Sequence, residues 1–225
     1  MRSTLSIESK IVALASDPVL PERMRAALRG GQRGRSAAIR MSPQLAYGRH
    51  AGPAPYTARA AAVLLLMFQR GGRWHLPLTE RPLSLAHHGG QISLPGGAID
   101  AGESASEAAV RELREELGVA CRLDLLGPLA ECYVFASDYT IAPWLAVTPD
   151  APQWQPHAGE VESVVELPIE SLLRQDAVGS LTIDRGPLVF HAPCFRVGEA
   201  RIWGATSMIL SEFAGVLRDC SNSFA

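Results

Sequence analysis

The chain lacks several features that would place it in a specialised class of protein. It has one lysine, Lys10, so nearly all of its positive charge comes from arginine. Its longest apolar run, Ala60 to Phe68, is far shorter than the roughly 20 residues of a membrane-spanning helix. Its four cysteines include no Cys-x-x-Cys pair, which argues against a zinc site and a disulfide framework. These absences predict free thiols in a reducing, cytoplasmic compartment and no membrane partner.

The charge that is present is distributed unevenly. Residues 1–60 carry ten Lys or Arg and three Asp or Glu, whereas residues 61–225 carry eleven and twenty. The N-terminal arginines either bind nucleic acid or form a basic surface that packs against the acidic body. We favour the second interpretation, and expect no nucleic-acid partner, because no aromatic residues alternate with these arginines as stacking platforms.

The 225 residues suit one domain with an appendage. Residues 5–15 and 21–28 have helical patterns, and residues 30–55 are rich in Gly, Arg, Pro and Ser without a period. We therefore predict a helical, basic extension with a linker over residues 1–55 and the main domain over 56–225.

The main domain mixes strands and helices without a strict alternation, which predicts an α/β fold with a mixed sheet. The expected strands cover residues 60–68, 74–79, 92–94, 123–130, 133–135, 141–147, 164–167, 189–190 and 195–197. A tight turn is expected at residues 94–97, a short helix at 168–173 and a closing amphipathic helix at 207–217.

The strongest helix signal runs from Ser104 to Leu117. Ser104 and Glu107 form a capping box, and Gly118 suits a left-handed helix end. Residues three and four apart share a helix face, so three carboxylates, those of Glu112, Glu115 and Glu116, should cluster. Such a cluster is either a solvated acidic face or a site for a hard cation such as Mg²⁺ or Mn²⁺.

A family signature covers this helix and the turn before it. Gly97, five residues, Glu103, seven residues and then the run from Arg111 to Val119 fill every fixed position of the Nudix box. The chain thus resembles the Nudix hydrolases. This resemblance implies a Nudix-type α/β/α sandwich and Mg²⁺-dependent (or Mn²⁺-dependent) hydrolysis of a nucleoside diphosphate derivative.

More of the chain resembles the coenzyme A pyrophosphatase branch. Residues 78–81, then Leu85, His88, 90–92 and 95–97 are similar to the motif that this branch has before the box. The branch implies cleavage of coenzyme A or acyl-coenzyme A. Ala86, however, stands where a basic residue is usual in the branch. That departure keeps open hydrolysis of ADP-ribose, dinucleotides or other nucleotides, and a third alternative is a catalytically silent domain that binds a nucleotide.

The resemblance also implies roles for residues of the site. Glu112 and Glu116 would bind the metal directly, Glu115 would bind it directly or through water, and the Gly96 carbonyl would complete the set. Arg111 would hold Glu103 or Glu112 in place. The general base would be a glutamate of the box or Glu160 from a later loop.

Four further residues are candidates for contact with the small-molecule substrate. Arg81 would clamp phosphate oxygens, unless it is a surface arginine paired with Glu80. His88 would bind a phosphate or lie at the rim, Gln91 would support the turn, and Trp203 would either stack on adenine or belong to the core. The resemblance also allows a homodimer built with the segment before Ala60.

Overall fold

The computed structural model describes residues 7–30, 41–43, 54–84, 89–186 and 188–222. The main sheet has eight strands, with β1 and β7 parallel and the other strand pairs antiparallel. It is therefore a mixed sheet, as predicted. Its strands are β1 (Arg59–Arg70), β2 (Arg73–Glu80), β3 (Ile92–Ser93), β4 (Gly96–Ala98), β5 (Asp124–Pro128), β6 (Cys132–Val134), β7 (Tyr139–Val147) and β8 (Ser163–Pro168).

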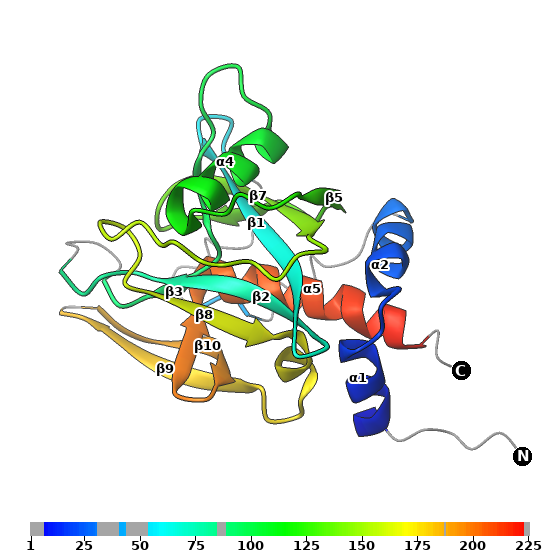
Figure 1. Cartoon of the computed structure of the whole chain (residues 1–225). Helices are drawn as coiled ribbons and strands as arrows, with labels where there is room; N and C mark the ends of the chain where they lie inside the picture. Colours follow the sequence, from blue (N-terminus) through cyan, green and yellow to red (C-terminus); the bar gives the residue numbers. More distant parts are fainter. Residues whose placement is uncertain (1–6, 31–40, 44–53, 85–88, 187, 223–225) are drawn as a thin grey trace, which may run out of the picture.

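Strand β1 carries the two cores of the molecule on its two faces. Successive side chains of a strand point to opposite faces. Ala62, Leu64 and Leu66 lie in the core beneath α4 (Ala105–Leu117), whereas Leu65 and Met67 lie in the core that contains α5 (Gly204–Asn222). The sheet thus lies between the two helices (Figure 1), which confirms the predicted α/β/α sandwich.

The N-terminal helices pack against the same core as α5. These are α1 (Ile7–Ala15) and α2 (Leu20–Arg29), and Leu14, Leu20 and Met24 are fully buried. Arg25 Nη2 lies 2.7 Å from Asp124 Oδ2 in an ion pair. One arginine of the N-terminal extension therefore contacts the acidic main domain. Most of the predicted linker lies outside the described residues, although Met41 within it is buried in this core.

A second sheet of three strands follows the 3-10 helix η1 (Ile169–Leu173). It consists of β9 (Val178–Arg185), β10 (Leu188–Val197) and β11 (Ala200–Trp203). The two short strands expected at 189–190 and 195–197 are wrong as separate elements, because β10 is continuous, and β9 and β11 were not expected. In β9 the adjacent Gly179 and Ser180 interrupt the apolar pattern, so that only Leu181 and Ile183 alternate with polar residues and the strand signal is short.

Two other boundaries differ from the sequence-based expectation. Gly96 and Gly97, expected within the turn at residues 94–97, belong instead to β4, whose residues 96–98 pair with residues 61–63 of β1. The last helix, α5, begins at Gly204 and is longer than the predicted segment 207–217. Within the described residues, no helix is long and apolar enough to cross a membrane.

Candidate functional site

The site is built where β4 enters α4. The antiparallel pairing of β4 with β1 fixes Gly96 opposite Val63 and Gly97 opposite Ala62. The capping box then starts α4, with Ser104 Oγ accepting from the Glu107 amide at 3.3 Å. Leu113 and Leu117 are fully buried against the sheet, which anchors the helix over the two glycines. As a result, Glu112 and Glu116 of α4 lie against Gly97 and Gly96 of β4.

Glu112 lies directly against Gly97. A Cβ atom placed on Gly97 would be 2.4 Å from Glu112 Oε1, so only glycine leaves room for this carboxylate. The Glu112 side chain is 15% exposed. Burial raises the pKa of the Glu112 carboxyl, and the hydrogen bond from Arg111 opposes that rise. This close approach explains the glycine at position 97.

Glu116 is the most buried of the three carboxylates, with 7% of the residue exposed. Its Oε2 atom is buried and has no hydrogen-bond partner. Burial and the charge of Glu112 raise the pKa of Glu116 to about 8, against the lowering effect of a hydrogen bond from the Gly96 backbone N–H. A buried, unpartnered carboxylate oxygen beside a second carboxylate is what a cation would satisfy.

Arg111 forms hydrogen bonds with three glutamates of the site, Glu103, Glu112 and Glu115. Its Nε and Nη2 donate to the two carboxylate oxygens of Glu103, each at 3.0 Å. Its Nη1 donates to Glu112 Oε1 at 2.8 Å and to Glu115 Oε2 at 3.0 Å. These bonds hold the pKa of Arg111 above its ordinary value. The two glutamates considered as its alternatives, Glu103 and Glu112, are therefore both bound by it.

The other two candidate acids are more exposed. The Glu115 side chain is 58% exposed and that of Glu160 is 55% exposed. The loop that carries Glu160 docks on the end of α4, where the Gln155 and His157 amides donate to the Leu117 and Glu116 carbonyls at 2.9 Å. The charge of Glu160 is close enough to contribute to the raised pKa values of Glu112 and Glu116.

Arg81 connects the acidic helix to the neighbouring turn. Its positive charge lowers the pKa of the Glu116 carboxyl, against the larger effect of burial. Its Nε is buried without a hydrogen-bond partner. Between the described residues Arg81 and Glu80 no ion pair forms, and the Glu80 carboxylate instead accepts from Ser163 Oγ at 2.7 Å. Arg81 therefore retains a buried donor.

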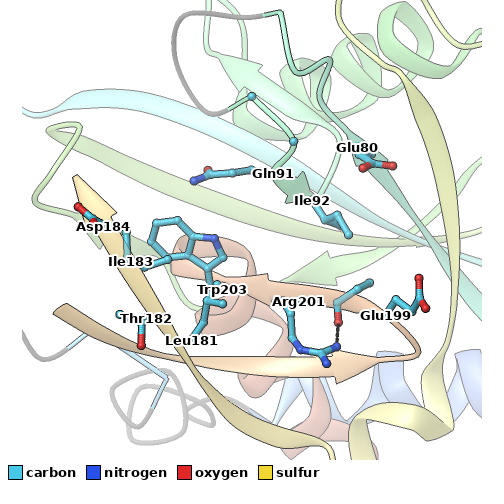
Figure 2. A pocket seen from close by; sticks show the side chains of 13 residues that line it. Glu80, Gln91, Ile92, Leu181, Thr182, Ile183, Asp184, Glu199, Arg201 and Trp203 are labelled. Carbon is cyan, nitrogen blue, oxygen red and sulfur yellow. Dashed lines mark hydrogen bonds between the residues drawn. The ribbon is translucent and has the colours of Figure 1, made fainter. Parts of the chain in front are cut away.

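Gln91 and Trp203, predicted from distant parts of the chain, line one pocket of about 740 Å³. The pocket lies between the turn before β3 and the three-stranded sheet. Figure 2 shows the Trp203 indole facing Gln91, with Ile183 and Asp184 of β9 beside it. Trp203 is half-buried and packs edge-on against Phe190 with ring centroids 6.4 Å apart. It is thus a pocket residue rather than a wholly buried core residue.

Some relevant positions were missed or lie elsewhere. The carboxylates of Asp184 and Glu199 line the pocket, and sequence reasoning missed them because they belong to the unexpected sheet. His88 and Ala86 lie outside the described residues.

The carboxylate oxygens of Glu112 and Glu116 on α4 are suitable ligands for a divalent metal ion. Across the described ranges, no group of three or more His, Cys, Asp or Glu side chains is arranged as a ready metal site. Glu112 and Glu115 are instead bound by Arg111. The unpartnered Oε2 of Glu116, beside the charge of Glu112, nevertheless provides hard oxygen donors of the kind that Mg²⁺ and Mn²⁺ prefer.

Comparison with known proteins shows that the chain belongs to the Nudix hydrolase family. The NUDIX domain family matches residues 58–183. Human mitochondrial coenzyme A diphosphatase NUDT8 is 36% identical over 160 residues, which cover 69% of this chain and 67% of that protein. Nudix hydrolase 3 of Caenorhabditis elegans is 26% identical over 172 residues, covering 68% and 71%. An uncharacterized Nudix hydrolase, NudL of Salmonella newport, is 29% identical over 158 residues, covering 69% and 81%.

Proposed function

Because the chain belongs to the Nudix hydrolase family, we propose that it hydrolyses the pyrophosphate bond of coenzyme A or an acyl-coenzyme A. The products would be 4′-phosphopantetheine, or its acyl form, and adenosine 3′,5′-bisphosphate. The observation that carries this proposal is the 36% identity with the human coenzyme A diphosphatase. We also propose a cytoplasmic location, in keeping with the four free cysteines.

Nudix hydrolases generally need a divalent metal ion, and here we propose Mg²⁺ or Mn²⁺. Glu112 and Glu116 would bind it directly, with Glu115 and the Gly96 carbonyl completing the protein ligands. When bound, such an ion withdraws charge from the phosphate oxygens and lowers the pKa of water. For Arg111 to release Glu115 costs little, because that carboxylate is exposed and exposed ion pairs are weak.

Two arginines, Arg111 and Arg81, position the groups that react. Arg111 keeps Glu112 in place through its bidentate bond to Glu103, which fixes the guanidinium plane. The buried Nε of Arg81 would donate to a phosphate oxygen and so remove its own unpartnered state. Both actions position the pyrophosphate against the carboxylates of α4.

Glu160 is the general base that we propose. In this proposal Glu112, Glu115 and Glu116 bind the metal; Glu112 is also held by Arg111, and Glu116 is buried. Glu160 is half-exposed, and it contributes to the field at Glu112 and Glu116. It can therefore accept a proton from water and release it to solvent.

A second candidate function keeps this mechanism and changes the substrate to ADP-ribose, a dinucleotide or another nucleoside diphosphate derivative. Ala86 favours it, because a basic side chain at this position would suit the 3′-phosphate of coenzyme A. A panel of substrates separates the two functions. We would measure kcat/KM for coenzyme A, dephospho-coenzyme A and ADP-ribose, with Mg²⁺ and with Mn²⁺.

The proposed function predicts that coenzyme A has a higher kcat/KM than ADP-ribose by at least about tenfold, the scale of one good polar contact. A preference for dephospho-coenzyme A or ADP-ribose would instead establish the second candidate. Glu116→Gln, measured in parallel, shows that the turnover belongs to this site.

A further inference from the structure

The three-stranded sheet does more than extend the fold, because it forms one wall of the pocket lined by Gln91 and Trp203. Its strands contribute Thr182 and Asp184 from β9 and Trp203 from β11. The opposite wall comes from Glu80 and the turn that ends at β3 (Figure 2). The volume of about 740 Å³ is in the range of small-molecule sites.

This pocket adjoins the proposed phosphate site through Arg81. The Arg81 amide donates to the Gln91 carbonyl at 3.0 Å, and the Gly90 amide donates to the Arg81 carbonyl at 2.9 Å. Gly90 and Gln91 both line the pocket. On its other side, the Glu80 carbonyl next to Arg81 accepts from the Glu162 amide at 2.8 Å, and the loop before Glu162 docks on α4 where the His157 amide donates to the Glu116 carbonyl at 2.9 Å. A pyrophosphate held at Arg81 would thus have one of its two substituents directed into the pocket.

The charge of the residues that line the pocket favours one half of coenzyme A over the other. Among the described lining residues, Glu80, Asp184 and Glu199 are acidic and Arg201 is the one cation. Arg201 Nη1 donates to the Gly198 carbonyl at 3.0 Å and to the Ala200 carbonyl at 2.9 Å. The net negative lining opposes the adenosine half, which carries a 3′-phosphate, and accepts the uncharged pantetheine arm.

We infer that the pocket between the β3 turn and the three-stranded sheet binds the pantetheine arm of the substrate, with Trp203 packing along it. This inference rests on the proposed function and adds which half of the substrate the second sheet recognises. It replaces the expectation that Trp203 stacks on adenine. It also implies a substrate preference, because Asp184 and Glu199 would repel an acyl group that ends in a carboxylate.

The two reaction products are separate probes of the two halves. Trp203→Ala is expected to weaken inhibition by 4′-phosphopantetheine about tenfold, through lost aromatic contact area, and to change inhibition by adenosine 3′,5′-bisphosphate less than about twofold. Trp203→Phe, which keeps an aromatic ring, should recover most of the loss. Val189→Ser is the control, since Val189 is exposed on β10 and lies outside the pocket.

Exposed charges give a second test that does not alter the packing. Wild-type enzyme should hydrolyse acetyl-coenzyme A with a higher kcat/KM than succinyl-coenzyme A. The double variant Asp184→Asn/Glu199→Gln should reduce that ratio by about threefold, more at low salt than at high salt. Asp176→Asn, an exposed carboxylate outside the pocket, should leave the ratio unchanged.

The outcomes are decisive in both directions. Selective loss of phosphopantetheine binding supports the inference. Selective loss of adenosine bisphosphate binding, or equal loss of both, overturns it even though coenzyme A is still hydrolysed. If the wild-type enzyme does not hydrolyse coenzyme A at all, the proposed function itself fails, and the inference fails with it.

Discussion

Arg111 Nη1 donates to Glu112 Oε1 at 2.8 Å, while Nε and Nη2 of the same guanidinium donate to the two carboxylate oxygens of Glu103. This geometry makes Arg111 a positioning residue for Glu112. Lysine keeps the charge but has no planar fork, so Arg111→Lys should lower kcat by about tenfold or more. Arg114→Lys, on the exposed face of α4, is the matched control. Equal kcat values for the wild type and Arg111→Lys would show that the fork is not needed.

Glu116→Gln tests the buried carboxylate while keeping its shape. Since Glu116 is proposed to bind the metal, loss of its charge should lower kcat by about two orders of magnitude, as for other lost transition-state contacts. Stability to urea at neutral pH should change little, because a carboxyl with a pKa of about 8 is largely protonated there and a glutamine oxygen can still accept from the Gly96 amide. Glu131→Gln, at an exposed position, should retain wild-type turnover. Near wild-type activity of Glu116→Gln would remove Glu116 from the metal ligands.

Gly97→Ala tests the close approach between backbone and carboxylate. The new Cβ would lie 2.4 Å from Glu112 Oε1, so this side chain must move. We expect kcat to fall about tenfold or more, since misplacement of a catalytic group by about 1 Å has large effects. Gly215→Ala, in α5 with no heavy atom within 4 Å of the new Cβ, should keep full activity. Full activity of Gly97→Ala would contradict the placement of Glu112.

Glu212 is a buried carboxylate on the opposite side of the sheet. It is 3% exposed, and Oε1 accepts from the Ala130 amide at 2.7 Å. Burial raises the pKa of Glu212 from 4.5 to about 7, while the neighbouring Cys132 stays a neutral thiol with its pKa near 11. A raised carboxyl pKa means that the folded state binds the proton more tightly. The stability from this group is therefore full below pH 4.5 and is lost as the pH rises through 7.

Glu212→Gln should remove that pH dependence. A glutamine oxygen can still accept from Ala130, so the variant should be more stable than wild type at pH 8 by about 1–3 kcal/mol. Below the ordinary carboxyl pKa the two proteins should be equally stable. Urea unfolding at both pH values measures this, with the exposed Glu162→Gln as control. A difference that does not grow with pH would contradict the assigned titration.

The N-terminal extension should contribute to global stability. Met24 on α2 is fully buried in the core shared with α5, so Met24→Ala should cost about 2–4 kcal/mol. Val12→Ala, at a position 47% exposed, should cost far less. If Met24→Ala leaves urea unfolding unchanged, α2 packs too weakly to belong to the cooperative unit.

The sequence predicted the parts of the molecule that local signals determine. The capping box at Ser104, the left-handed Gly118 and the apolar period of Leu113 and Leu117 are all local, and α4 forms as expected. The clustering of Glu112 with Glu116 and the contacts of Arg111 followed from helical spacing and the box. These features need no knowledge of the rest of the chain.

The parts that could not be predicted depend on distant contacts. β4 is a strand because Gly96 and Gly97 pair with β1, although two glycines alone indicate a turn. β9 has only a short alternation of apolar and polar residues, interrupted by Gly179 and Ser180, and pairs along its length with β10. The pocket joins Gln91 to Trp203 across more than a hundred residues, so its acidic lining was not visible in any motif.

The most direct test of the central claim is to identify the products formed from coenzyme A by the wild-type enzyme with a divalent metal ion. We predict equal amounts of 4′-phosphopantetheine and adenosine 3′,5′-bisphosphate, formed at least about a hundredfold more slowly by Glu116→Gln. Release of inorganic phosphate instead, or turnover that Glu116→Gln leaves unchanged, would contradict cleavage of the pyrophosphate bond at the carboxylates of α4.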